Sequence, residues 1–173
     1  MPPEPPGRVL TNTTPLIALA QVQVFPLLQA LYGALWVPPA VYREVVTEGH
    51  DRPGAQETAE AVAAGWLTVL PLHQPAVAQR FQSQWLLGDG ESEVLALAQE
   101  HAATLVLLDE ERAVRYARAL GLPVLRTVGV LLQAKTRHLL PHVKPSLDAL
   151  RTLGFRLGDR VYQQALQHAG ETP

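Results

Sequence analysis

Short apolar runs alternate with helix-like segments along most of the chain, and this alternation constrains the fold more than any other feature. The runs expected to form strands cover residues 9–11, 34–37, 66–70, 104–108 and 123–125. Glycine and proline at the ends of the intervening segments predict helices over 14–20, 25–32, 39–46, 55–64, 75–87, 88–98 and 110–120. We therefore expect right-handed βαβ crossovers. They give an α/β fold of three layers, with a mostly parallel central sheet, helices on both faces and a helical C-terminal segment over 130–169.

Length and composition fit one domain. The chain has 173 residues, of which 47% are hydrophobic, which is enough to form a hydrophobic core without stabilising disulfides or metal ions. We expect a proline-rich tail over 1–7 and a single domain over 8–173. The chain has no cysteine, which excludes disulfides and thiolate metal sites. The N-terminus lacks a leader pattern and the apolar runs are too short to span a bilayer, so we expect a soluble cytoplasmic protein without membrane contact.

Charge is divided unevenly along the chain. Residues 1–111 contain 13 Asp or Glu against 4 Lys or Arg, whereas residues 112–173 contain 10 Lys or Arg against 3 Asp or Glu. An acidic cleft beside a basic surface would suit a metal-dependent enzyme that binds nucleic acid, because phosphate contacts dominate nucleic-acid affinity. Ordinary charged helix surfaces also produce such an imbalance, so the pattern supports this interpretation without establishing it.

Four oxygen-bearing side chains occupy positions that converge in an α/β sheet. Asn12 and Asp109 each follow a predicted strand, Glu91 lies in the first turn of a helix after a glycine loop, and Glu44 lies within a helix among apolar residues. Mg²⁺ and Mn²⁺ prefer such oxygen ligands, and these ions activate water for phosphodiester hydrolysis. The four residues are our candidate metal and catalytic site.

Four motifs then resemble one bacterial and archaeal branch of the PIN-domain family. The segment 11–19, Thr-Asn-Thr-Thr-Pro-Leu-Ile-Ala-Leu, is similar to its Asp-Thr-Ser-Pro-Leu-Ile opening. Residues 37–45 resemble its second motif, residues 88–98 its Gly-x-Gly-Glu motif, and residues 107–110 its final acid. Residues 153–157 and 161–162 resemble the C-terminal segment, so the similarity extends from about residue 9 to 170.

This resemblance implies a PIN fold like that of VapC-type toxins, which are metal-dependent ribonucleases controlled by a small antitoxin protein. Glu44, Glu91 and Asp109 match the second, third and fourth acids, and Thr13 and Thr14 match adjoining hydroxyl residues. Asn12 replaces the first acid, so weaker binding of Mg²⁺ or Mn²⁺ is expected, since an amide brings no charge. The resemblance also implies a homodimer; Leu131, Leu132, Leu139 and Leu140 would form its contact or complete the core.

Each of the four candidate residues also has a purely structural interpretation. Asp109 would cap the following helix, Glu91 would favour a helix start, Glu44 would be a solvated helix acid, and Asn12 would bond into the turn before Pro15. Three further acids compete with the matched positions or would replace the missing charge, namely Glu93, Asp89 and Glu110.

Basic residues follow Asp109, the last of the four candidate residues in the sequence. Arg112, Arg115 and Arg118 recur at every third position of the predicted helix and would bind RNA phosphate, or form a solvated face neutralised by Glu111. Thr127 opens the next helix and would contact a phosphate or cap that helix.

Other site types lack support. Pro141 lies between His138 and His142, which argues against a helical zinc pair. The chain has neither the Asp-x-Asp of haloacid-type phosphatases, the early acidic pair of receiver domains, nor a lysine-containing phosphate loop. Two functions remain: a metal-dependent endoribonuclease, expected to be a toxin, and a non-catalytic relative that binds RNA or protein.

Overall fold

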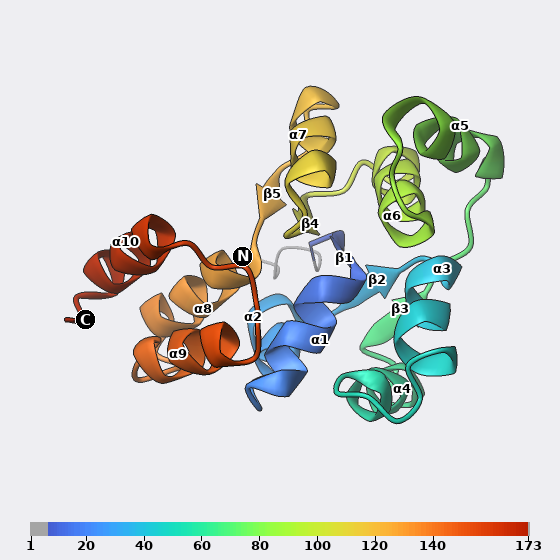
Figure 1. The fold of residues 1–173 in the computed structure, drawn as a ribbon. Helices are drawn as coiled ribbons and strands as arrows, with labels where there is room; N and C mark the ends of the chain where they lie inside the picture. Colours follow the sequence, from blue (N-terminus) through green and yellow to red (C-terminus); the bar gives the residue numbers. More distant parts are fainter. Residues whose placement is uncertain (1–6, 173) are drawn as a thin grey trace, which may run out of the picture.

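The computed structural model describes residues 7–172, so almost all of the predicted tail at 1–7 lies outside the described residues. Five strands form one sheet in the order β3-β2-β1-β4-β5, and all its neighbouring pairs are parallel. Their bounds are β1 (Val9–Thr11), β2 (Leu35–Val37), β3 (Leu67–Val69), β4 (Leu105–Leu107) and β5 (Val124–Leu125). The predicted parallel α/β fold is confirmed (Figure 1).

Helices cover both faces of this sheet (Figure 1). They are α1 (Thr13–Gln21), α2 (Leu27–Tyr32), α3 (Pro39–Tyr42), α4 (Ala55–Ala63), α5 (Pro75–Trp85), α6 (Asp89–Glu100), α7 (Glu111–Ala119), α8 (Thr127–Thr136), α9 (Lys144–Thr152) and α10 (Asp159–Ala169). None of the helices within residues 7–172 combines the length and the hydrophobicity that crossing a bilayer requires.

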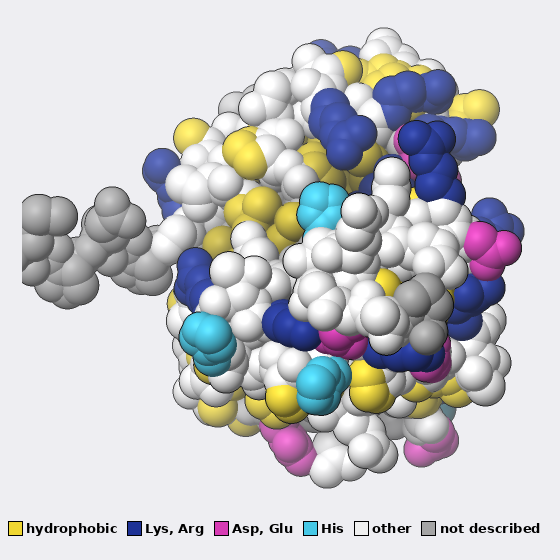
Figure 2. Space-filling view, turned by 90° about the vertical axis from the view of Figure 1, so that its left-hand side faces the viewer, with side chains coloured by type: hydrophobic (Ala, Val, Ile, Leu, Met, Phe, Trp, Pro, Cys, Tyr) yellow, Lys and Arg dark blue, Asp and Glu magenta, His cyan; other side chains and the backbone are white. Residues whose placement is uncertain are grey.

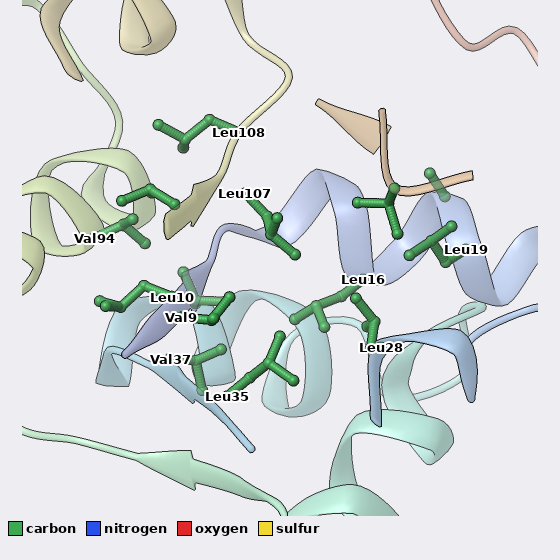
Figure 3. Packing of buried hydrophobic residues seen from close by; sticks show 14 of the residues in the cluster. Val9, Leu10, Leu16, Leu19, Leu28, Leu35, Val37, Val94, Leu107 and Leu108 are labelled. Carbon is green, nitrogen blue, oxygen red and sulfur yellow. The ribbon is translucent and has the colours of Figure 1, made fainter. Parts of the chain in front are cut away.

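The core lies between the sheet and its helices. Leu10 of β1 and Leu107 of β4 are fully buried, and they lie in one cluster with Leu16 of α1 and Val94 of α6 (Figure 3). All three residues of β1 are buried, as expected for a central strand covered on both faces. Leu131 is also fully buried and therefore completes the core, whereas Leu139 is exposed.

The helix predicted over 39–46 is divided in the structure. It starts with α3 and continues as a π-helical turn, η1 (Arg43–Thr47). One extra residue per turn changes the direction of the side chains, and such turns are frequent at functional sites. The predicted C-terminal segment over 130–169 is helical in three pieces, because the chain turns between α8 and α9 and again at Gly154, where φ is 86°.

Glu171 fastens the C-terminal end to the helical layer. Its nearly buried carboxylate accepts hydrogen bonds from the Lys135 ammonium and from the backbone N–H groups of Val143 (2.8 Å) and Lys144 (2.9 Å). Burial opposes ionisation, but these donors outweigh it and lower the pKa of Glu171 to about 2 from an ordinary 4.5. The charged carboxylate therefore stabilises the folded state.

Glu171→Gln is expected to destabilise the protein by about 2–3 kcal/mol and to lower Tm by about 4–12 °C, since charged hydrogen bonds at a buried site are lost. The pKa is depressed on folding, so this contribution is complete above pH 4.5 and is lost as pH falls towards about 2. Thermal unfolding of both forms across this range, with the exposed Glu60→Gln as control, measures the effect. Equal Tm values for Glu171→Gln and wild type at pH 7 would contradict it.

Candidate functional site

The carboxyl ends of β1 and β4 lie side by side and hold two of the candidate residues. Thr11 is paired with Leu107, and the backbone N–H of Asn12 donates to the Leu107 carbonyl at 3.1 Å. Asn12 therefore lies beside the segment that leads to Asp109. The chain leaves β1 towards β2 and later crosses to β4, so strand order reverses here, which is where ligands bind in open parallel sheets.

The Asn12 side chain is buried and incompletely bonded. Asn12 is 4% exposed and precedes α1, yet it makes no side-chain capping bond, so the alternative in which it bonds into the turn before Pro15 is wrong. Its Oδ1 atom is buried and lacks a hydrogen-bond partner within the described part of the chain. Buried polar oxygens are nearly always satisfied, so this atom calls for a partner.

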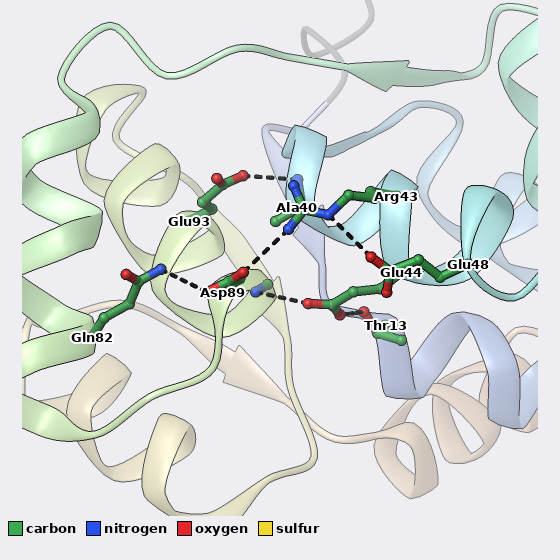
Figure 4. Close-up of polar contacts among 9 residues, drawn as sticks. Thr13, Ala40, Arg43, Glu44, Glu48, Gln82, Asp89 and Glu93 are labelled. Carbon is green, nitrogen blue, oxygen red and sulfur yellow. Dashed lines mark hydrogen bonds and ion pairs between the residues drawn. The ribbon is translucent and has the colours of Figure 1, made fainter.

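Glu44 points inward from the π-helical turn η1. Its Oε2 accepts a 2.6 Å hydrogen bond from Thr13 Oγ1, and its Oε1 accepts one of 3.1 Å from the backbone N–H of Gly90 (Figure 4). Three segments distant in sequence therefore meet at one carboxylate. The alternative of a solvated helix acid is wrong for Glu44.

Gly90 is where α6 approaches the other two residues most closely. A Cβ atom at this position would lie 2.8 Å from Glu44 Oε2 and 3.1 Å from Asn12 Oδ1. A larger residue would therefore have to displace the end of the Glu44 side chain from the position in which Thr13 and the Gly90 N–H hold it. The Asn12 amide oxygen and the Glu44 carboxylate therefore both lie on the side of Gly90 to which a side chain would point.

Glu91 begins α6 and closes its first turn. Its Oε2 accepts a 3.0 Å hydrogen bond from the Gly88 N–H, which is the helix-start role that the sequence also suggested. Burial raises the pKa of Glu91, the Gly88 bond opposes that rise, and the charges of Glu110 and Glu44 add to it. Glu91 is thus part of the same negative region, although its carboxylate is turned towards Gly88.

Asp109 is held by the start of α8. Its two carboxylate oxygens accept hydrogen bonds from the Thr127 backbone N–H (2.9 Å) and from Thr127 Oγ1 (2.6 Å). Burial raises the pKa of Asp109, and Thr127 together with the Arg126 guanidinium opposes that rise. Glu110, not Asp109, caps α7, so the capping interpretation of Asp109 is wrong.

The acids considered as competitors or replacements are engaged elsewhere. Glu93 accepts a hydrogen bond from the Ala40 N–H at the start of α3, and Asp89 is bound by Arg43 and Gln82 (Figure 4). Glu110 accepts from the Ala113 N–H. None of the three carboxylates is directed at Asn12, so the missing charge is not restored by a neighbour.

A cleft of about 730 Å³ opens beside Asp109. Its lining includes Thr14, Asp109 and Arg126, together with Phe155 and Arg156 from the connection between α9 and α10. Arg126 also donates a hydrogen bond to the Asp109 carbonyl at 3.3 Å and forms an ion pair with Glu111. The sequence did not indicate Arg126 as a site residue. Its position directly after the last strand, next to Thr127, was the available signal.

The predicted arginine row is exposed on α7. Arg112 donates to the Leu86 carbonyl at 3.0 Å, and Arg115 lies over the Tyr116 ring at 5.4 Å. Arg118 is close enough to Glu111 to lower the pKa of that acid, after Arg126, which contributes most. Figure 2 shows Lys and Arg side chains spread over one face, with apolar side chains exposed between them.

The structure brings together the oxygens of Asn12 and Glu44 beside Gly90, whereas within residues 7–172 the carboxylates of Glu44, Glu91 and Asp109 do not all lie within 4.8 Å of one another. Asn12 supplies a buried oxygen without a partner, Glu44 supplies a carboxylate fixed beside it, and Glu91 and Asp109 are carboxylates whose ionisation is opposed by burial. A cation would satisfy the amide oxygen and relieve the repulsion between Glu44 and Glu91. Oxygen-only ligands select Mg²⁺ or Mn²⁺ over softer ions.

Comparison with known proteins assigns the chain to a family. A family model described as a PIN domain matches residues 8–171. A search of curated proteins returned no match.

Proposed function

Because the chain belongs to the PIN-domain family, we propose that it is a metal-dependent endoribonuclease whose site consists of Asn12, Glu44, Glu91 and Asp109. PIN domains have a nuclease-type fold, bind RNA and generally use divalent metal ions. The observation that carries the proposal is the partnerless Asn12 Oδ1 beside the Glu44 carboxylate, both packed against Gly90.

The four residues would hold Mg²⁺ or Mn²⁺, which supplies Lewis-acid stabilisation of a phosphate and activation of water. The protein's own groups position these ligands. Thr13 and the Gly90 N–H fix the Glu44 carboxylate, and Thr127 fixes both oxygens of Asp109. Such preorganisation keeps the ligands in place before substrate arrives.

RNA would enter through the cleft beside Asp109. Arg126 and Arg156 lie in its lining and would neutralise phosphate charge, while Phe155 offers apolar surface. The exposed Arg112, Arg115 and Arg118 on α7 would extend this basic surface. Thr127 would act through Asp109, which its hydroxyl already contacts.

We also propose that the protein is the toxin of a VapC-like toxin–antitoxin pair, controlled by a small antitoxin and acting in the cytoplasm as a homodimer. The similarity of four motifs to that branch supports this finer assignment. A non-catalytic RNA-binding or protein-interaction module is the second candidate. The replacement of an acid by Asn12 specifically favours it.

The proposal is tested by Glu44→Gln, which keeps the size of the side chain but removes its charge. Mn²⁺ affinity and the cleavage rate of labelled single-stranded RNA are each expected to fall by about tenfold or more, because affinity follows the number of ligand charges. Calorimetry and gel assays measure the two quantities.

Glu48→Gln is the matched control, since Glu48 lies four residues further on and its side chain is 62% exposed. We expect this variant to behave as wild type. If Glu44→Gln and Glu48→Gln bind Mn²⁺ equally well, Glu44 is not a ligand and the proposed site is wrong.

A further inference from the structure

We propose that His73, Glu100 and His101 form a second metal site, selective for a transition-metal ion of the Zn²⁺ type. One ring nitrogen from each histidine and one carboxylate oxygen of Glu100 lie within 4.8 Å of one another. Imidazole nitrogen and carboxylate oxygen are the usual Zn²⁺ ligands in sites without cysteine.

The packing of α5 on α6 brings the three residues together. His73 precedes α5, Glu100 is the last residue of α6, and His101 follows it. The Glu100 oxygens accept hydrogen bonds from the backbone N–H groups of His73 (3.0 Å) and Gln74 (2.7 Å). Glu100 therefore holds the His73 backbone beside the end of α6, and each carboxylate oxygen keeps a lone pair for a further partner.

His101 gives the independent sign of a ligand. Its ring is fixed by an edge contact with Trp36, with centroids 5.4 Å apart, and lies 5.7 Å from the His73 ring. Its Nε2 atom is buried and has no hydrogen-bond partner among residues 7–172. Buried imidazole nitrogens are normally satisfied, and a cation at Nε2 would satisfy this one.

The ligand types and the position of this site distinguish it from the candidate site of Asn12, Glu44, Glu91 and Asp109, here called the acid cluster. Two imidazoles and one carboxylate leave a fourth tetrahedral position for water, whereas the acid cluster offers oxygen alone. Glu91 and Glu100 are nine residues apart on α6, which corresponds to about 14 Å along the helix axis. A cation here would fasten α5 to the C-terminal end of α6, far from the other end that carries Gly90.

The test uses the purified full-length chain in excess Mg²⁺, which occupies oxygen-only sites. We expect one equivalent of Zn²⁺ to bind and raise Tm, and Co²⁺ in its place to give the visible absorption of a tetrahedral ion. His73→Ala is expected to weaken Zn²⁺ binding by about tenfold or more. His73 is exposed, so the substitution should leave the fold intact.

His101→Ala removes the imidazole whose Nε2 atom is buried, and His50→Ala is the control because its side chain is 74% exposed and lies outside the group. Loss of Zn²⁺ binding in His73→Ala and His101→Ala, with His50→Ala unchanged, supports the site. Wild-type protein that takes up no Zn²⁺ in Mg²⁺, or His73→Ala that binds Zn²⁺ like wild type, overturns it. These measurements of metal binding and Tm do not require RNA cleavage, so their outcome is independent of the proposed nuclease activity.

Discussion

Asn12→Asp is expected to raise Mn²⁺-dependent RNA cleavage by about tenfold to a hundredfold, equivalent to about 1.4–2.7 kcal/mol. The change converts a buried oxygen that lacks a partner into a charged one beside the Glu44 carboxylate. Divalent ions depend on the number of carboxylates around them, so a further charge strengthens the site. Gel assays of labelled single-stranded RNA measure the rate.

A second readout of Asn12→Asp does not depend on catalysis. Without metal, the introduced carboxylate would repel Glu44 and lower Tm, and Mn²⁺ would restore it by more than it stabilises wild type. Asn12→Ala is the control because it removes the oxygen and adds no charge. An Asn12→Asp variant with wild-type Mn²⁺ affinity and wild-type cleavage would show that position 12 does not face a cation.

Gly90→Ala is expected to reduce cleavage by about a hundredfold while Tm stays the same or rises. The new Cβ would lie 2.8 Å and 3.0 Å from the two Glu44 oxygens, which Thr13 and the Gly90 N–H hold in place. A shift of about 1 Å in a positioned catalytic group costs about 10²-fold. Alanine within a helix is more stable than glycine by about 1 kcal/mol, so folding is not the cause of the loss.

Gly88→Ala separates this steric effect from a general effect on the loop. At position 88 a Cβ would meet Glu91 at 3.7 Å, an ordinary contact. We expect Gly88→Ala to keep most of the activity, as measured by RNA cleavage together with thermal unfolding. Equal cleavage by Gly90→Ala and wild type would mean that the Glu44 position seen here is not needed for catalysis.

Local sequence signals predicted which candidate residues lie at the carboxyl edge of the sheet, but not the side-chain contacts between distant elements at that edge. Asn12 and Asp109 could be placed because each directly follows an apolar strand, and parallel strands end at the same edge. The contact of Glu44 with Gly90 joins elements 46 residues apart, and it depends on the π-helical turn that redirects the side chain. No periodicity in the sequence indicates such a turn.

Competing interpretations were separated only by the side-chain contacts. The sequence indicated Asp109 as the alternative cap of the following helix, because Asp is a preferred capping residue. In the structure Glu110 caps α7, and Thr127 holds Asp109. The proximity of His73 to His101 likewise requires α5 to pack back on α6. Spacing along the chain carries no information about that contact.

The most direct test of the proposed site is cleavage of labelled single-stranded RNA by the wild-type protein in Mn²⁺ or in EDTA, beside Asn12→Asp and Asp109→Ala. We predict cleavage in Mn²⁺ by wild type, faster cleavage by Asn12→Asp, and none in EDTA or with Asp109→Ala. Cleavage by Asn12→Asp alone would identify the wild-type chain as the non-catalytic relative. Absence of cleavage by all three forms, or cleavage that survives EDTA and Asp109→Ala, would contradict a metal-dependent nuclease site at these residues.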